Sequence, residues 1–247
     1  MSDQIIFAII LAAGKGTRMN TSLPKALVQL NGIPIIQHLI ESLGEAGIED
    51  IIVVIGHESE QIKKVLGKKF RYAEQVEQKG TAHAVMQTKK MVTTTDRDVL
   101  VFVGDSPLIS TKTIQQLIEH HRTKNADCTF LTADFASRYP YARIVRDEEG
   151  ALTKCVEQKD ATEDELEISE ALSSHFIFNA NLLYENIDEV EADQNNGEYY
   201  LTDMIGIFLE KGLKVETLKV EHYEELVGLN TLEDIEWAEK IMQDERA

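Results

Sequence analysis

A repeated alternation of short apolar runs with helix-like segments over the first 110 residues most constrains the fold of this 247-residue chain. The runs Ile5–Leu11 and Ile51–Ile55 are continuous, and each is followed within three residues by glycine. This pattern is typical of parallel strands buried on both faces. Between them, apolar residues recur at helical spacing over 33–43, with Pro34 in the first turn and Gly47 beyond the last. Together these segments predict a βαβ unit.

The alternation continues to residue 133 and predicts an α/β fold with a doubly wound, mostly parallel mixed sheet. Parallel strands end at one edge of such a sheet, and open α/β sheets bind their ligands there. Further strands are expected at 71–75, 99–103 and 128–133, and further helices at 59–66, 82–92 and 111–124.

Beyond residue 135 the pattern changes to a predicted β-hairpin around a turn that contains Gly150. The acidic segment 160–170 is expected to be an exposed loop or a short helix. Thr231 and Asp234 are spaced like a capping box at the start of a closing helix. The hairpin strands are expected at 142–146 and 152–157, later strands at 174–178 and 214–220, and a helix near 199–211.

The chain is acidic, with 25 Lys and Arg against 43 Asp and Glu and a formal net charge of −18. This balance argues against a general nucleic-acid binder and a basic membrane-surface protein, because both depend on clustered cations. The charge is uneven: residues 1–125 carry 15 basic and 13 acidic side chains, whereas residues 126–247 carry 10 and 30. Most carboxylates of the second half are expected on solvated helix faces and loops.

The longest apolar stretch, residues 5–13, is far shorter than the roughly 20 residues that span a bilayer. An acidic residue, Asp3, stands where a signal peptide has basic ones, so a cytoplasmic location is expected. Cys128 and Cys155 lie in strand-like runs. We therefore expect buried free thiols rather than a disulfide or a metal-binding pair.

A glycine-rich turn, LAAGKGTRM at 11–19, directly follows the first predicted strand. Glycine lets backbone N–H groups approach phosphate oxygens without interference from a Cβ atom. Met19 stands where a dinucleotide fingerprint has its third glycine, which argues against an NAD-type dehydrogenase, and the Gly-Lys-Ser/Thr of a Walker A loop is absent. With Lys15, Arg18 and Lys25, the loop predicts a triphosphate site; the alternative is a structural turn with solvated cations.

Two further motifs carry side chains suited to nucleotide chemistry. In EQKGTAHAV at 77–85, the Gln78 amide offers a donor and an acceptor to a base edge, and Gly80-Thr81 precedes a helical run. An ordinary helix start is the alternative. In VGDSPLI, Asp105 follows an apolar strand and is a natural Mg²⁺ ligand, although a turn-capping aspartate has the same pattern.

Seven segments in order resemble the uridylyltransferase domain of bacterial bifunctional N-acetylglucosamine-1-phosphate uridylyltransferase/glucosamine-1-phosphate acetyltransferases: LAAGKGTRM with LPK, EQKGTAHAV, VGDSPLI, YARIV, VEQKDAT, GEYYLTDMI and VGLN. The resemblance runs from about residue 6 to residue 230. It implies a Rossmann-like, GT-A-like nucleotidyltransferase fold in one domain, with a nucleotide-binding half at 1–134, a hairpin-containing sugar-binding subregion at 135–230 and a C-terminal helix at 231–247. The chain ends without the hexapeptide-repeat β-helix of the bifunctional proteins, so neither acetyl transfer nor its trimer contacts are expected.

The resemblance also implies roles for individual residues. Arg18 and Lys25 would neutralise phosphate charge during catalysis, and Asp105 and Asn230 would hold the catalytic Mg²⁺. Glu157 would bind sugar hydroxyls, although a surface strand glutamate is the default interpretation of that position. The nucleotide would be lined by Leu11, Ala12, Ala13 and Gly14, and the pyrimidine would be read by Gln78, Gly80 and Thr81.

Two positions of the implied sugar pocket depart from the family pattern. Ala142 stands where the family has the glycine of YGRI. Leu172, followed by Ser173 and Ser174, stands where it has the asparagine of an NTG segment. The apolar Leu172 side chain lacks the donor and acceptor of an amide, so the departures bear on which sugar is recognised.

The sequence therefore predicts a Mg²⁺-dependent sugar-1-phosphate nucleotidyltransferase that forms a nucleotide sugar and pyrophosphate. UTP and N-acetylglucosamine-1-phosphate are the leading pair. The alternatives are another hexose-1-phosphate or phosphorylated alcohol with UTP, dTTP or CTP, and a non-catalytic nucleotide-sugar sensor. Retention of Arg18, Lys25, Asp105 and Asn230 together favours an enzyme.

Overall fold

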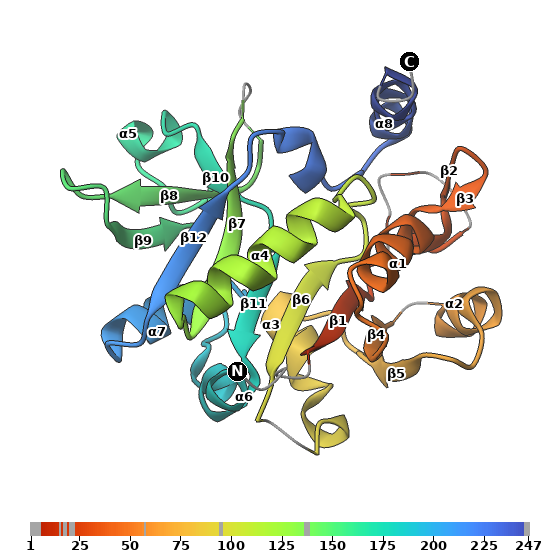
Figure 1. Ribbon diagram of the computed structural model, residues 1–247, viewed down its shortest axis with the longest axis horizontal. Helices are drawn as coiled ribbons and strands as arrows, with labels where there is room; N and C mark the ends of the chain where they lie inside the picture. Colours follow the sequence, from red (N-terminus) through yellow and green to blue (C-terminus); the bar gives the residue numbers. More distant parts are fainter. Residues whose placement is uncertain are drawn as a thin grey trace.

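The computed structural model of the chain describes residues 6–14, 16, 19, 23–56, 58–93, 96–135 and 139–244. Its described strands form a ten-stranded mixed sheet in the order β5-β4-β1-β6-β11-β7-β10-β8-β9, with β12 paired to β7 (Figure 1). The predicted α/β fold with a mixed sheet is confirmed. The strands are β1 Ile6–Ala12, β4 Ile51–Ile55, β5 Arg71–Glu74, β6 Asp98–Val103, β7 Cys128–Asp134, β8 Ala142–Arg146, β9 Leu152–Val156, β10 Glu170–Leu172, β11 Phe176–Asn179 and β12 Val215–Lys219.

The first half of the chain supplies the parallel part of the sheet. Strand β1 lies between β4 and β6 and runs parallel to both, with Leu11 opposite Val54 on one side and Val103 on the other. Every residue of β4 is buried, as its continuous apolar run predicts for a strand covered on both faces. The carboxyl ends of these strands therefore meet at one edge.

The second half of the chain interleaves with the first in the same sheet. Strand β11 is antiparallel to both β6 and β7 and lies between them. Strands β10 and β11 pair with successive parts of β7, with Ala171 opposite Ala133 and Phe176 opposite Phe130. Ser174, between β10 and β11, has a φ of 66° and interrupts the extended backbone. On its other side, β10 pairs with β8.

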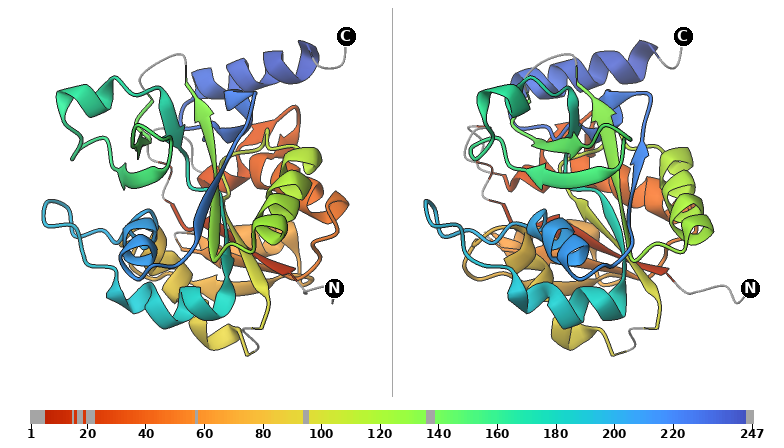
Figure 2. Two further views of the ribbon diagram at one scale, coloured as in Figure 1. Left: turned by 60° about the vertical axis from the view of Figure 1, so that its left-hand side comes forward. Right: turned by 90° about the vertical axis from the view of Figure 1, so that its left-hand side faces the viewer.

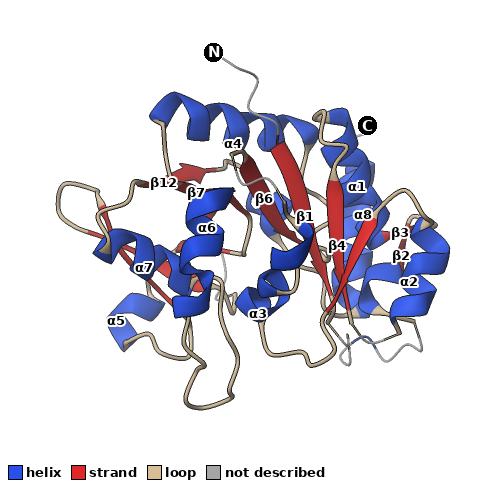
Figure 3. Ribbon diagram, turned by 90° about the horizontal axis from the view of Figure 1, so that it is seen from below, coloured by secondary structure: helices blue, strands red, loops and turns tan. Residues whose placement is uncertain are grey.

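Helices cover both faces of the sheet, which gives the doubly wound arrangement (Figures 2 and 3). The first of two hydrophobic clusters joins one sheet face to α1, α2, α4 and α8, and the second joins the other face to α3, α6 and α7. A separate ribbon pairs β2 Gln29–Leu30 with β3 Ile33–Pro34. The helices are α1 Ile35–Glu45, α2 Ser59–Leu66, α3 Thr81–Met86, α4 Thr111–Lys124, α5 Glu163–Leu166, α6 Ala180–Asn186, α7 Asp203–Glu210 and α8 Leu232–Asp244.

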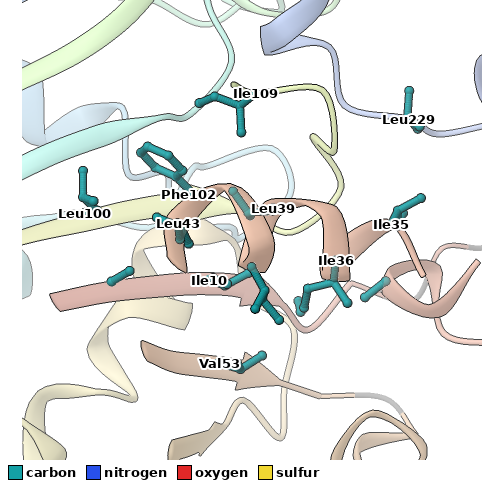
Figure 4. Close-up of a cluster of buried hydrophobic side chains, with 14 of the residues drawn as sticks. Ile10, Ile35, Ile36, Leu39, Leu43, Val53, Leu100, Phe102, Ile109 and Leu229 are labelled. Carbon is teal, nitrogen blue, oxygen red and sulfur yellow. The ribbon is translucent and has the colours of Figure 1, made fainter. Parts of the chain in front are cut away.

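The first hydrophobic cluster fixes the strand ends that form the candidate site. Figure 4 shows Ile36 and Leu39 of α1 packed toward Ile10 of β1, with Phe102 of β6 beside them. Leu229, from the loop before α8, belongs to the same cluster and is fully buried. Burial of these side chains supplies roughly 1.5–3 kcal/mol each and anchors the β1, β6 and 228–230 segments together.

Several predicted boundaries are confirmed, including 51–55, 59–66 and 111–124. Helix α3 ends at Met86, well before the expected residue 92. Thr88 Oγ1 donates to the Val85 carbonyl at 2.6 Å and contacts the Tyr184 hydroxyl at 2.7 Å, so a buried tertiary contact and a short 3₁₀ segment replace the last helical turns. The short strand β10 and helix α6 were not predicted.

Helix α7 begins at Asp203 rather than near the expected residue 199. The backbone of Tyr199 is engaged elsewhere: its N–H donates to the Lys79 carbonyl at 2.8 Å, and its carbonyl accepts from Ala82 N at 2.9 Å. These backbone bonds hold the segment before α7 in a non-helical conformation against the start of α3.

Smaller predictions are also tested by the structure. The Thr231 and Asp234 capping box is confirmed, because Asp234 Oδ2 accepts from Thr231 N at 2.8 Å and Thr231 Oγ1 accepts from Asp234 N at 3.2 Å. Cys128 and Cys155 are free thiols; the first is buried and the second half-buried. None of the helices in the described part of the chain is both long and apolar enough to cross a membrane.

Candidate functional site

A cavity of about 420 Å³ opens at the carboxyl ends of β1 and β6. This edge is where an open α/β sheet binds its ligand, and the volume lies in the range of small-molecule sites. Among the described residues, the cavity is lined by Leu11, Ala12, Ala13, Gly14, Gly16, Lys25, Ala26, Gln75, Gln78, Gly80, Thr81, Ala84, Val103, Gly104, Asp105, Glu198 and Asn230.

The four residues predicted to line the nucleotide, 11–14, all face this cavity. Leu11 O accepts from Gly104 N at 2.9 Å, which ties the end of β1 to the end of β6. A Cβ atom added at Gly14 would meet no other atom within 4 Å, so a ligand can approach the backbone there. Arg18, the second predicted catalytic cation, lies outside the described residues, as does Lys15.

Three polar side chains from distant parts of the chain meet at the cavity. Lys25, at the start of the short 3₁₀ helix Lys25–Leu27, forms an ion pair with Asp105, which follows β6 by two residues. Lys25 Nζ also donates to Asn230 Oδ1 at 2.8 Å. Sequence separations of 80 and 205 residues are closed by these two contacts, so the fold assembles a group that no local motif contains.

The loop before α8 carries Asn230 to this point through its backbone. Leu229 N donates to the Asp105 carbonyl at 2.9 Å. A Cβ atom at Gly228 would lie 3.1 Å from Asp105 Oδ1, closer than most Cβ contacts, so glycine lets the two segments approach. Asn230 Nδ2 donates to the Gly228 carbonyl at 2.8 Å, which leaves the amide oxygen facing Lys25.

The chemistry of these donors suits Mg²⁺, which takes oxygen ligands and is held by one or two protein groups plus substrate phosphates and water. The Asp105 carboxylate and the Asn230 amide oxygen already converge on one cationic group, the Lys25 ammonium. Within the described ranges, no cluster of three or more His, Cys, Asp or Glu side chains has metal-binding geometry. The protein ligands would therefore be these two oxygens, and the residues present fit the ion.

The three residues predicted to read the base, Gln78, Gly80 and Thr81, also line the cavity. Gly80 has a φ of 93°, and a Cβ atom on it would lie 2.4 Å from the Tyr199 carbonyl oxygen, so only glycine fits there. Thr81 Oγ1 accepts from Leu201 N at 2.9 Å. The segment 78–81, called the base loop after its predicted role, is therefore joined to the segment before α7 by hydrogen bonds.

The Gln78 amide is partly committed to the loop itself. Its Nε2 donates to the Gln75 carbonyl at 2.9 Å and to the Val76 carbonyl at 3.4 Å, so the oxygen is the atom left for a ligand. Gln75, which the sequence interpretation did not single out, is only 3% exposed and also lines the cavity. The available signal was its position: it ends the predicted strand at 71–75, at the ligand-binding edge of the sheet.

Glu157 lies just beyond the end of β9, beside the segment that leads into α7. Thr202 Oγ1 donates to Glu157 Oε1 at 2.5 Å. Burial raises the pKa of the Glu157 carboxyl above its ordinary value, and burial together with the Glu157 charge raises the pKa of Asp203 to about 6. Lys159, the nearby cation, is ion-paired with Asp193 and Asp160. Glu157 is thus a desolvated carboxylate bonded to Thr202, whose neighbour Leu201 donates to Thr81.

The two departures from the family pattern occupy the hydrophobic interior. Ala142 and Leu172 are each 2% exposed and lie opposite one another in the β8–β10 pairing. Leu172 belongs to the second hydrophobic cluster with Ile144. Ser174, two residues further on, has a left-handed backbone with a φ of 66°, and the side chain at 172 carries no amide.

Glu198 is a further cavity residue that sequence reasoning missed. It is half-buried and belongs to the GEYYLTDMI segment, whose order along the chain was informative although no residue of it was assigned a role. Its approach to the cavity depends on the Tyr199 backbone bonds to the base loop. A similar argument holds for Val103 and Gly104, which face the cavity because β6 ends there.

Comparison with known proteins gives one family over most of the chain. The model of the MobA-like NTP transferase domain matches residues 8–194. The chain is 40% identical over 237 residues to the Bifunctional protein GlmU of Streptococcus agalactiae, and 40% identical over 236 residues to that of Staphylococcus epidermidis. Each alignment covers 96% of this chain and 52% of the relative, so the chain spans about half the length of these relatives.

Two solved structures share the architecture at low sequence identity. A UDP-glucose pyrophosphorylase complexed with UDP-glucose superposes with a TM-score of 0.80 at 19% identity, covering 98% of this chain and 99% of the other. A putative glucose-1-phosphate thymidylyltransferase from Bacillus anthracis, in complex with a sucrose, gives 0.78 at 19% identity, with coverage of 97% and 96%. These similarities establish the Rossmann-like nucleotidyltransferase fold.

Proposed function

The chain belongs to the family of MobA-like NTP transferase domains, and on that premise we propose that it transfers a nucleotidyl group from UTP to a sugar-1-phosphate, with release of pyrophosphate. The convergence of Lys25, Asp105 and Asn230 at the mouth of the cavity is the observation that carries this proposal. It joins a phosphate-binding cation to two oxygen ligands beside an open glycine loop. A 40% identity to the corresponding half of the GlmU proteins supports it.

The reaction needs no side-chain nucleophile. The phosphate oxygen of the sugar-1-phosphate is already anionic, and it attacks the α-phosphorus of the triphosphate while pyrophosphate leaves in line. The protein's task is to position the two substrates and neutralise charge. The 11–14 backbone would orient the phosphates, and Lys25 would move from its carboxylate partner to the phosphate oxygens.

Asp105 and Asn230 would hold Mg²⁺, and Arg18 would supply a further positive charge. When bound, the ion provides charge neutralisation at the phosphate oxygens. Lys25 contacts the same two oxygens, so its ammonium compensates the charge of the Asp105 carboxylate that would hold the metal.

N-acetylglucosamine-1-phosphate is the leading acceptor, supported by the identity to the GlmU proteins and by Glu157 beside Thr202. A carboxylate can accept two hydroxyl hydrogen bonds from a sugar ring. The buried Leu172 argues that recognition of a 2-acetamido group does not use an amide at that position. Ala142 is equally buried and has no polar side-chain atom, so another hexose-1-phosphate or a phosphorylated alcohol is the alternative acceptor, with dTTP or CTP as alternative donors.

One matrix assay tests the proposal. Purified protein with Mg²⁺ is incubated with UTP, dTTP or CTP against N-acetylglucosamine-1-phosphate, glucose-1-phosphate, galactose-1-phosphate and a panel of phosphorylated alcohols, and pyrophosphate is measured. We expect the fastest release with UTP and N-acetylglucosamine-1-phosphate. Release with a different pair corrects the substrates but keeps the reaction class, whereas binding of nucleotide sugar without turnover of any pair identifies a sensor and contradicts the proposal.

A further inference from the structure

The side-chain amide of Gln75 is held in one orientation by a backbone carbonyl. Gln75 is almost fully buried at the end of β5, and its own N–H donates to the Ile55 carbonyl at 2.8 Å. Its amide nitrogen lies 2.9 Å from the Gly80 carbonyl oxygen. A carbonyl oxygen can only accept, so the amide atom facing it must be the NH₂ group.

The second proton of that NH₂ group points to a histidine. Gln75 Nε2 lies 3.0 Å from Nδ1 of His83, which is on α3 and half-buried. Because the NH₂ group donates, Nδ1 must accept, which places the ring proton on Nε2. Burial, together with the charge of Lys79, lowers the pKa of His83, which favours the neutral ring in which Nδ1 keeps its lone pair.

A second amide approaches the other side of the ring. Gln87 Nε2 donates to the His83 carbonyl at 2.9 Å and lies 3.2 Å from the ring Nε2. A neutral imidazole accepts at only one nitrogen. The Gln75 contact is shorter and belongs to a buried side chain, whereas the half-buried Gln87 amide already donates to the His83 carbonyl, so we assign the acceptor to Nδ1.

With both amide protons committed, only the oxygen of Gln75 is left for a ligand. No hydrogen bond from another described residue reaches Gln75 Oε1, and the residue lines the cavity beside Gly80 and Thr81. Gln78 is arranged in the same sense, since its Nε2 donates to the Gln75 carbonyl. On both glutamines the oxygen is therefore the amide atom left to accept a hydrogen bond from a ligand.

We propose that His83 is a positioning residue for nucleobase selection: it locks the Gln75 amide with its oxygen toward the cavity. The site then prefers a base with an N–H donor at its pairing edge, as in the N3–H of uracil or thymine. Cytosine presents an unprotonated N3, whose lone pair would face the Gln75 oxygen. This inference rests on the proposed function, because it concerns the donor nucleotide of the same site.

The test measures binding of UTP and CTP by calorimetry in Mg²⁺ buffer without any sugar phosphate. We expect the wild type to bind UTP more tightly. In the wild type, rotating the Gln75 amide by 180° would break its hydrogen bonds to both the Gly80 carbonyl and His83. In His83→Leu the same rotation would break only the bond to the Gly80 carbonyl. One neutral hydrogen bond contributes modestly, so the UTP-to-CTP affinity ratio should fall roughly three- to tenfold. His83→Asn, whose amide oxygen can accept from Gln75, should restore the ratio.

Gln87→Ala is the matched control, because it removes the neighbour on the other side of the same ring and leaves the Gln75 contact intact; its ratio should equal that of the wild type. The ring tautomer is read independently from imidazole ¹⁵N shifts of the unmodified protein. We expect a protonated Nε2 and an unprotonated Nδ1.

Three results would overturn the inference: no preference for UTP in the wild type, an unchanged ratio in folded His83→Leu, or a protonated Nδ1. The proposed function fails separately, if no nucleotide and acceptor pair yields pyrophosphate, because the binding ratios are measured without turnover. If His83→Leu does not fold, the ¹⁵N shifts of the unmodified protein still test the ring tautomer on which the inference depends.

Discussion

The cavity proposed to bind the nucleotide and the region around Glu157 proposed to bind the sugar, called the sugar side below, handle acidic groups in opposite ways. At the cavity, the Asp105 carboxylate is paired with Lys25. On the sugar side, Glu157 and Asp203 have raised pKa values, mainly from burial, while the neighbouring Lys159 is bound to Asp193 and Asp160. Charge compensation is therefore concentrated where phosphates are expected, and the sugar side offers in Glu157 a desolvated acceptor suited to neutral hydroxyl groups.

The two regions differ in construction as well. The cavity is built mainly from backbone at the ends of parallel strands, with glycines at close approaches such as Gly80 and Gly228. The sugar side is built from β8–β10 and the segment before α7, joined by side-chain contacts such as Thr202 to Glu157. We expect substitutions at the cavity to affect turnover strongly, and those on the sugar side to affect specificity and pH dependence.

The largest expected effect is at the paired carboxylate. Asp105→Asn removes the charge that balances Lys25 and that would bind the metal. We expect turnover to fall by roughly 10²-fold or more, as for loss of one preorganised electrostatic contact of about 2.7 kcal/mol. Pyrophosphate release is the measurement, and Asp164→Asn on the exposed helix α5 is the control. Near wild-type turnover of Asp105→Asn would show that the paired carboxylate of the cavity is not needed for the reaction, and the proposed difference between the two regions would not hold.

The next prediction concerns His175, a fully buried residue that lies between β10 and β11, where the two regions meet. Burial lowers its pKa to about 4, so between pH 6.5 and 4 the unfolded chain binds a proton that the folded chain does not. Stability should fall as the pH drops through this window, by on the order of 3 kcal/mol from this residue. In urea unfolding, His175→Leu should lose less free energy of unfolding than the wild type between pH 6.5 and pH 4. Equal losses for the two proteins would show that His175 is not the source of this pH dependence.

Two glycines with the same kind of backbone allow the cost of a positive φ to be separated from the cost of a steric clash with a neighbouring segment. Gly80 and Gly150 both have positive φ, but a Cβ atom meets the Tyr199 backbone only at Gly80 and has open space at Gly150. Gly80→Ala should destabilise the protein by roughly 1–3 kcal/mol and raise the KM for the nucleotide about tenfold, because the base loop must shift. Gly150→Ala should leave that KM unchanged. Equal KM values for the two variants would show that the base loop tolerates displacement.

The smallest expected effect is on the sugar side. Because the Asp203 pKa is raised to about 6, the folded chain holds more protons than the unfolded chain above the ordinary carboxyl pKa, and the contribution of this residue to stability falls as the pH rises toward 6. Asp203 is substantially exposed, so the loss should be below about 1 kcal/mol. Between pH 4 and pH 6, where His175 raises the stability of both proteins, Asp203→Asn should therefore gain slightly more stability than the wild type in urea unfolding. An equal or larger gain for the wild type would contradict the sign.

Much of the fold could be predicted because its signals are local. The apolar run Ile51–Ile55 reproduces β4 to the residue, and the helix at 111–124 matches α4. The prediction lost accuracy where a partner distant in sequence decided the outcome. Thr88 ends α3 through Tyr184, and Tyr199 delays α7 through its bonds to the base loop.

The candidate site divides along the same line. Gly14, Gly80 and Asp105 could be singled out because glycine turns and strand-end carboxylates have meaning within a few residues. Gln75 could not, because a glutamine at the end of a strand becomes a base-reading candidate only when its amide nitrogen is seen bonded to Gly80 and His83.

By itself, the sequence determined the α/β class, the glycine-rich loop at the end of the first strand, and the uneven distribution of acidic residues, since these depend on periodicity, glycine positions and composition. Only the tertiary structure decided that Lys25 lies between Asp105 and Asn230, and that Leu172 is buried in the hydrophobic interior. Lys25 meets Asp105, 80 positions away, and Asn230, 205 positions away, through strand order and loop packing. These arise from the summed burial of the whole chain rather than from any short segment.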